Sequence, residues 1–372
     1  MLHTSIYAII GELFMDKVEL FPVPNITFSD GPDFRDYLVK NYDPTQVDHE
    51  LTIIVGITKH PSDVEFFDAL KDFGFKVKRT LGSVYHMKYD LEGGALECYV
   101  THNSETGIVI FYTNFRKTEE IPKIRDFLKF DKNTYYLFFK PLLMKQIAEE
   151  LMDRYENLEI HEFTARRSPR SRFEACIRPE YKRTISYWGE DGRETLQELE
   201  YQYGVLPRKF VVNIPETIKF KIDGEGLFTF SHGDLRILFE ILGKAVDESR
   251  KTMEAYNGSS FRVLPVKTAH RQFEIPSSTP VSIHLRNPIA FHEMDELKVL
   301  LEDKQYTIVD FVAQEGSLFL STDVVSKSGY QFRIKANENH IKMFPDGEKN
   351  FAEFMQFYEF ILQSVDPKAE LV

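Results

Sequence analysis

The sequence predicts an α+β protein, in which an N-terminal α/β segment is followed by antiparallel sheets with long helices on one face. The main basis is a β-β-α pattern that occurs in residues 220–247 and again in residues 332–366. Each stretch has the order strand, tight turn, strand ending in Phe, loop with Gly, and long amphipathic helix ending in Val-Asp. A second basis is the number of short β-branched runs separated by turn residues. These patterns predict duplicated units whose helices cover a sheet.

The chain of 372 residues exceeds one ordinary domain, so we expect two or three. Changes in pattern place an N-terminal α/β segment over 1–83, a first β-β-α region with an Arg-rich arm over 84–205, and a C-terminal duplicated β-β-α region over 206–372. Hydrophobic residues make up 42% and aromatic residues 14% of the chain. This composition is typical of globular proteins and not of disordered chains.

In the N-terminal segment, a short helix over 32–42 precedes a strand, a helix and a strand over 50–57, 61–74 and 75–80. The second of these helices is indicated by Val64, Phe67 and Leu70 on one face and by Gly74 at its end. Strand, helix and strand at this spacing predict a right-handed crossover with the two strands parallel.

From about residue 84 the pattern changes to strands in hairpins, beginning with a pair around Gly93 and Gly94 within residues 84–100. Further strands are expected over 107–113, 135–139, 158–163, 261–266, 281–285, 306–312 and 316–322. Further helices are expected over 119–130, 141–155 and 291–303. A weaker unit of the same kind is expected over 173–204.

The charge and cysteine content restrict the class of protein. A net charge of -12 argues against a protein that coats a polyanion, because such binding needs many Lys and Arg side chains. No run approaches the roughly 18 apolar residues of a membrane span, so no membrane contact is expected. The two cysteines, Cys98 and Cys176, lie in apolar alternating segments and are expected to be small core residues. A reducing cytoplasm is the expected location.

One segment departs from the acidic character of the chain. Between residues 165 and 188, seven basic side chains face only Glu174 and Glu180, a local charge of +5. Arginines at this density can neutralise phosphates, and nearby aromatic rings can stack on bases. The candidate nucleic-acid-binding residues are Arg166, Arg167, Arg170, Arg172, Arg178, Lys182, Arg183, Tyr187 and Trp188. The alternative is a solvated linker, or an arm that pairs with an acidic face of the same protein.

Catalytic patterns are weak. The sequence has no GxxxxGK[ST] loop, no GxGxxG after a strand and no GxSxG elbow. A site at the end of the strand over 50–57 would use Lys59, His60, Ser62 and Asp63, although helix capping explains the last two. Isolated acids at strand or hairpin positions lack metal-binding spacing, and no metal or cofactor is expected. These acids are Asp90, Glu97, Asp310 and Glu315.

The sequence therefore favours a non-enzymatic binding or assembly module that contacts nucleic acid through the Arg-rich segment. One alternative is a divergent metal-dependent hydrolase or nuclease whose acids come from separate strands. Another is a component of a larger complex, with a protein partner or a second copy of the chain.

Overall fold

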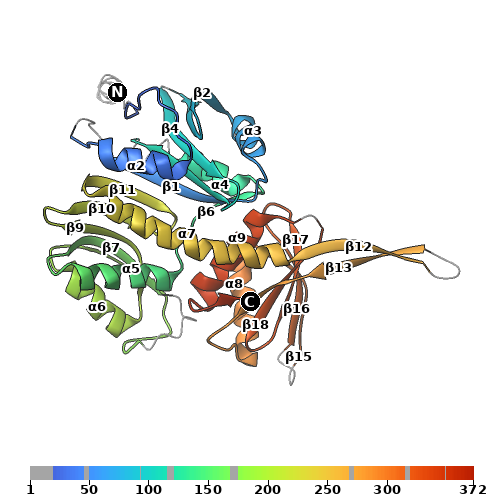
Figure 1. Ribbon diagram of the computed structural model, residues 1–372. Coiled ribbons are helices and arrows are strands. Elements are labelled where there is room, and N and C mark those ends of the chain that lie inside the picture. Colours follow the sequence, from blue (N-terminus) through green and yellow to red (C-terminus); the bar gives the residue numbers. More distant parts are fainter. Residues whose placement is uncertain are drawn as a thin grey trace, which may run out of the picture.

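The prediction of an α+β protein is confirmed by the computed structural model (Figure 1), in which all pairs of named strands are antiparallel. The structure describes residues 20–45, 50–92, 94–114, 121–167, 175–267, 272–314, 319–347 and 349–372. Within these ranges there are eight α-helices and nineteen strands.

The first sheet has eleven strands, in the order β2-β3-β4-β5-β1-β11-β10-β9-β7-β8, with β6 paired to β1. Their bounds are β1 Leu51–Thr58, β2 Phe75–Leu81, β3 Val84–Leu91, β4 Gly94–Asn103, β5 Ile108–Thr113, β6 Thr134–Tyr136, β7 Glu159–Arg167, β8 Arg183–Trp188, β9 Leu206–Ile214, β10 Ile218–Asp223 and β11 Leu227–Gly233.

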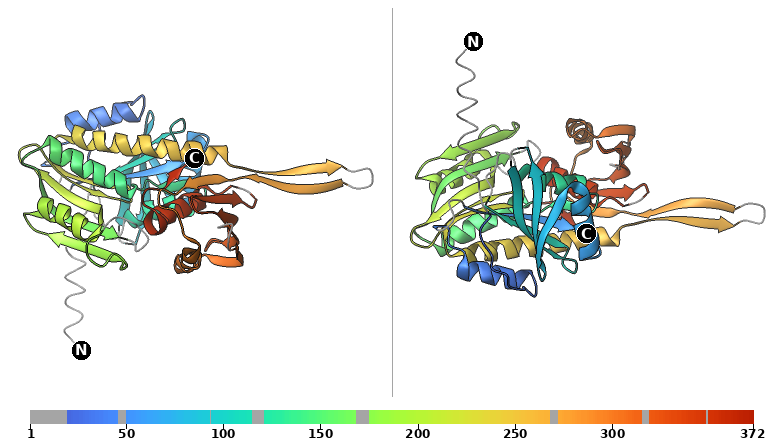
Figure 2. Two further views of the ribbon diagram at one scale, coloured as in Figure 1. Left: turned by 90° about the horizontal axis from the view of Figure 1, so that it is seen from below. Right: turned by 90° about the horizontal axis from the view of Figure 1, so that it is seen from above.

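The second sheet has six strands, in the order β15-β16-β17-β18-β14-β19. Their bounds are β14 Val281–His284, β15 Thr307–Gln314, β16 Phe319–Val325, β17 Gln331–Ala336, β18 His340–Pro345 and β19 Glu370–Leu371. A separate two-stranded ribbon of β12, Ser260–Lys267, and β13, Gln272–Thr279, projects from the body of the molecule (Figures 1 and 2).

The helices lie between and around these sheets. Their bounds are α2 Gly31–Asn41, α3 Asp63–Phe73, α4 Ile121–Phe130, α5 Pro141–Arg154, α6 Gly192–Tyr203, α7 Leu235–Gly258, α8 Met294–Asp303 and α9 Phe351–Phe360. A π-helical turn, Ile361–Val365, continues α9. No helix among the described residues is long and apolar enough to cross a membrane.

The expected crossover over β1, α3 and β2 needs correction, because these two strands do not pair. They run in the same direction, but β3, β4 and β5 lie between them in the sheet. The reason is that β2 to β5 form a continuous antiparallel meander, and β5 returns to pair with β1, where Ile54 lies opposite Phe111. The α/β segment therefore joins an antiparallel sheet.

The two stretches of the recurring pattern each form a hairpin followed by a helix. The hairpin of β10 and β11 precedes α7, and the hairpin of β17 and β18 precedes α9. They belong to different sheets, and α7 has 24 residues whereas α9 has 10. The duplication stays a prediction, as does the division at residues 83 and 205, although the first sheet extends across both positions.

Two helices connect the first sheet to the second. The long helix α7 contacts β10 and β11 on one side and β14 and β19 on the other. Helix α9 contacts β6, and nine of its ten residues are buried. A surface helix would keep one polar face in water. The burial of α9 on nearly all sides shows that it lies inside the contact between the two parts of the molecule.

The two cysteines differ in environment. Cys98 in β4 is buried, as predicted, but Cys176 is exposed, so the expectation of a core position was wrong for Cys176. Cys176 lies in the irregular connection between β7 and β8, where no alternating strand forms to bury it.

Candidate functional site

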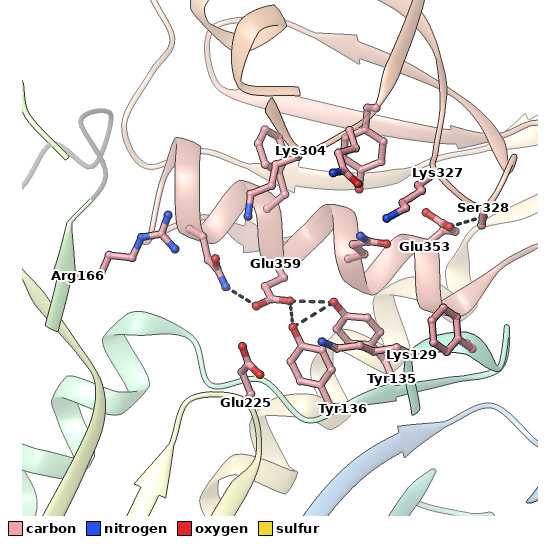
Figure 3. A pocket seen from close by; sticks show the side chains of 16 residues that line it. Lys129, Tyr135, Tyr136, Arg166, Glu225, Lys304, Lys327, Ser328, Glu353 and Glu359 are labelled. Atoms are coloured by element: carbon pink, nitrogen blue, oxygen red, sulfur yellow. Dashed lines mark hydrogen bonds between the residues drawn. The ribbon is translucent and has the colours of Figure 1, made fainter. Parts of the chain in front are cut away.

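A cavity of about 730 Å³ lies at the contact between the two parts of the molecule (Figure 3). We call it the interface pocket. Tyr135, Tyr136 and Lys129 line it from the side of β6 and α4, and Lys304 and Lys327 reach in from the side of the second sheet. Helix α9 forms its floor with Glu353 and Glu359. Its volume is typical of small-molecule sites.

Glu359 is a buried carboxylate with a full set of donors. Its Oε2 accepts hydrogen bonds from the hydroxyls of Tyr135 at 2.9 Å and Tyr136 at 2.5 Å, and its Oε1 accepts one from the Gln363 amide. An unpaired ion in this position would cost several kcal/mol, roughly, so the three bonds explain how it is tolerated. Burial, and next the charge of Glu359, raise the pKa of both tyrosines. Both phenols therefore stay protonated as donors.

A second carboxylate, Glu353, is incompletely satisfied. Its Oε1 accepts a 2.5 Å hydrogen bond from the Ser328 hydroxyl, but its Oε2 has no hydrogen-bond partner. The hydroxyl of Tyr306, which lines the same pocket, is also buried without a partner. Glu353 is 5% exposed and Tyr306 is 4% exposed. Buried polar atoms of this kind are rare, because each costs about 1–3 kcal/mol when left unpaired.

Basic side chains gather at one end of the pocket. Arg166 of β7 and Lys304 after α8 both line it, and Arg166 shares a smaller hollow with Arg208 of β9. Partial burial, the nearby Arg166, and then Arg208 and Lys182 lower the pKa of Lys304. We call these four residues the basic cluster. Within the described ranges, none of the four makes an ion pair, so the cluster carries uncompensated positive charge.

Two members of the Arg-rich segment thus join the pocket region, whereas others are engaged within the protein. Arg167 is buried, and its guanidinium donates to the backbone carbonyls of Tyr203 and Pro179. Arg183 lies over the Tyr203 ring, 4.5 Å from its centroid. Arg167 is thus held by the fold, and it is not displayed at the surface.

The two aromatic candidates lie on opposite faces of β8. The Tyr187 ring stacks on Phe163 at a centroid distance of 5.0 Å, and its hydroxyl bonds Asp191. The indole of Trp188 is 71% exposed at the edge of the sheet. Arg178 is exposed in the loop before β8. Arg170 and Arg172 lie outside the described residues.

The loop after β1 has structural partners for all of its candidate residues. Lys59 donates to Asn257, the His60 ring contacts Asp131 at 3.2 Å, and Ser62 caps α3. Asp63 accepts a 2.7 Å hydrogen bond from His102, which is the sign of a structural role.

The acids considered for a metal site are likewise dispersed. Asp90 pairs with Lys76 and Lys88, and Glu97 pairs with Lys78 and His86. Asp310 lies in β15 of the other sheet, and Glu315 is outside the described residues. In the part of the chain that the structure describes, no group of three or more His, Cys, Asp or Glu side chains has a metal-binding arrangement.

The fold and the pocket define an α+β protein with two antiparallel sheets and a polar, partly basic cavity between them. A protein-family model described as a family middle domain matches residues 143–225. An uncharacterised protein of Archaeoglobus fulgidus is 25% identical over 368 residues, which cover 95% of this chain and 99% of the relative. The likeness therefore extends over both sheets.

The sequence did not indicate the carboxylates of α9. Glu353 and Glu359 are embedded in the apolar stretch FAEFMQFYEFIL, and the aromatic residues alone suggested ordinary core packing. Two acids within a helix of that composition are the signal that could have pointed to a buried polar site.

Proposed function

We propose that this protein binds single-stranded nucleic acid, and that the basic cluster is its phosphate-contacting surface. The observation that carries the proposal is the convergence of Arg166, Lys182, Arg208 and Lys304 without ion-pair partners in the described residues. Like charges held this close repel one another, so a bound anion would relieve the repulsion. Phosphate groups are the anions that Arg and Lys side chains bind best in such clusters.

The neighbouring edge of the first sheet supports a strand in preference to an isolated phosphate. Strand β8 begins at Arg183, directly after Lys182, and ends at the exposed Trp188. At about 3.3 Å per residue, Lys182 and Trp188 lie roughly 20 Å apart. A single strand along this edge would meet phosphate-binding charges at one end and a ring for base stacking at the other.

The test is binding of fluorescently labelled single-stranded RNA, single-stranded DNA and duplex DNA, followed by anisotropy over a range of salt concentrations. We expect the single strands to bind more tightly than the duplex. Because each lost phosphate contact lowers the salt slope by about 0.7, Arg166→Ala with Lys304→Ala should lower it by roughly 1.4. Trp188→Ala should weaken single-strand binding by about 1–3 kcal/mol.

The matched control is Lys71→Ala with Lys76→Ala, which removes the same charge from two exposed positions that have acidic partners. This control should bind like the wild type. The proposal fails if the wild type binds no nucleic acid, or if the two double variants lose affinity equally.

The alternative of a metal-dependent hydrolase or nuclease is tested on the same samples. Incubation of the labelled strands with Mg²⁺ or Mn²⁺ should leave them intact if the protein only binds. Cleavage that an added chelator abolishes would favour the nuclease over the binding module.

A further inference from the structure

We infer that the interface pocket holds one nucleotide unit of the bound strand, with its phosphate at the basic cluster and its base at Glu353, and that guanine is the preferred base. This inference rests on the proposed function and specifies its ligand. It starts from two buried polar atoms without partners, Oε2 of Glu353 and the hydroxyl of Tyr306. A ligand that pairs both would remove two desolvation costs of the empty pocket.

The layout of the pocket fits an elongated ligand with different ends. In Figure 3, Arg166 and Lys304 lie toward one end, Glu353 and Ser328 lie toward the other, and Glu359 lies between them. The first end suits a phosphate, and the second suits a group that donates hydrogen bonds. A volume of about 730 Å³ is ample for one nucleotide.

The base end also offers a ring for stacking. Phe130 lines the pocket and is 77% exposed, which is unusual for a phenylalanine at the end of a helix whose other apolar residues are buried. A base lying on this ring would cover its apolar surface and gain stacking energy. Lys129, the preceding residue, lies 5.2 Å from the centroid of the Tyr136 ring and adds positive charge to the pocket wall.

The preference for guanine follows from the donor pattern that a carboxylate requires. An ionised carboxylate only accepts hydrogen bonds, and Glu353 has one unoccupied oxygen and one that accepts a single bond from Ser328. Guanine presents two adjacent N–H donors on its pairing edge. Adenine and cytosine present one amino group beside a ring acceptor, and uracil presents one N–H between two carbonyls that would face the carboxylate.

The experiment is calorimetric titration of the full chain with GMP, AMP, CMP and UMP, together with the strand-binding assay above. We expect GMP to bind with one site per chain and at least about tenfold more tightly than the other three. Glu353→Gln replaces an acceptor oxygen by a donor of similar size and should weaken GMP binding by about tenfold or more.

Two further variants keep the outcome interpretable. Tyr306→Phe removes the second unpaired atom without changing the ring, so it should fold as well as the wild type and bind GMP more weakly. Glu254→Gln changes an exposed acid of α7 and should have no effect.

The outcomes separate the inference from the proposed function. Strand binding without mononucleotide binding overturns the pocket inference alone, as does GMP binding that is unchanged in Glu353→Gln and Tyr306→Phe. Equal binding of all four nucleotides overturns the preference for guanine. GMP binding that depends on Glu353, in a protein that binds no strand, supports the pocket ligand and overturns the proposed function.

Discussion

The hydroxyl of Tyr136 donates a 2.5 Å hydrogen bond to Oε2 of Glu359, which lies 223 residues further along the chain. Tyr136 belongs to β6 of the first sheet, and Glu359 belongs to α9, which packs with the second sheet. Because Tyr135 donates to the same oxygen, one buried carboxylate ties both tyrosines to the C-terminal helix. This contact sets the position of the two sheets and forms one wall of the interface pocket.

Removal of this hydroxyl should destabilise the protein. Tyr136→Phe should lower the free energy of unfolding by about 1–3 kcal/mol, because a hydrogen bond to a buried charge is lost. Urea denaturation followed by tryptophan fluorescence or circular dichroism measures the change. Tyr201→Phe is the matched control, since Tyr201 is 74% exposed and should contribute little. Equal stability of the two variants would contradict the role of the Tyr136 contact.

The histidine His102 predicts a loss of stability in acid. Its side chain is fully buried against Phe66, with ring centroids 4.4 Å apart, and its Nε2 has no partner. Burial lowers the pKa of His102, and the hydrogen bond to Asp63 only partly opposes this. Below the ordinary His pKa of about 6.5, the unfolded chain therefore binds more protons than the folded protein, and stability falls with falling pH.

Urea denaturation at several pH values between about 7.5 and 5.5 tests this expectation. His102→Phe keeps the ring against Phe66 and removes the titration, so its stability should depend less on pH than that of the wild type. Burial also lowers the pKa of His86, so the dependence should be reduced and not abolished. His292→Gln, at an exposed position, should behave like the wild type. An unchanged slope in His102→Phe would contradict the prediction.

The turn between β10 and β11 requires glycine. Gly226 has a φ of +71°, and an added Cβ would lie 2.4 Å from the carbonyl oxygen of Leu137. Gly226→Ala should therefore lower the free energy of unfolding by at least about 2 kcal/mol, because both the strained backbone and the clash oppose it. Gly243→Ala, in the interior of α7 with no atom within 4 Å, should raise it by about 0.5–1 kcal/mol. Thermal or urea unfolding of the pair measures the contrast, and equal effects would contradict it.

The two cysteines should differ in reactivity. Burial raises the pKa of the Cys98 thiol, and Cys176 is exposed. Since the thiolate is the reactive form, a colorimetric thiol reagent should modify one cysteine in the native protein and both after denaturation. Cys176→Ser should be unreactive until it is unfolded. Rapid reaction of native Cys176→Ser would show that Cys98 becomes accessible through opening of the first sheet.

The sequence was sufficient to predict elements whose local signals agree. The helix over 61–74 was predicted from its apolar face and from Gly74, and α3 ends where Gly74 adopts a left-handed conformation. The capping role of Ser62 was also predicted, and its side chain accepts from the Glu65 amide. These features depend on neighbours along the chain, so periodicity and capping rules were enough.

Pairing between distant strands was not predictable in the same way. Local pattern suggested that β1 and β2 lie side by side, but β1 pairs with β5 and β11 instead. The choice among several apolar strands depends on which hairpins form between them, and no single segment carries that information.

The sequence by itself determined the α+β class, most of the elements and the position of the Arg-rich segment. Only the tertiary structure decided which charges matter, because it brought Arg166 beside Lys304 and buried Arg167 two strands away from solvent contact with Tyr203. It also turned Glu353 and Glu359, two acids in an apolar helix, into the floor of a pocket. The physical reason is that burial and electrostatic coupling depend on distances in space, which residues far apart in the sequence acquire only on folding.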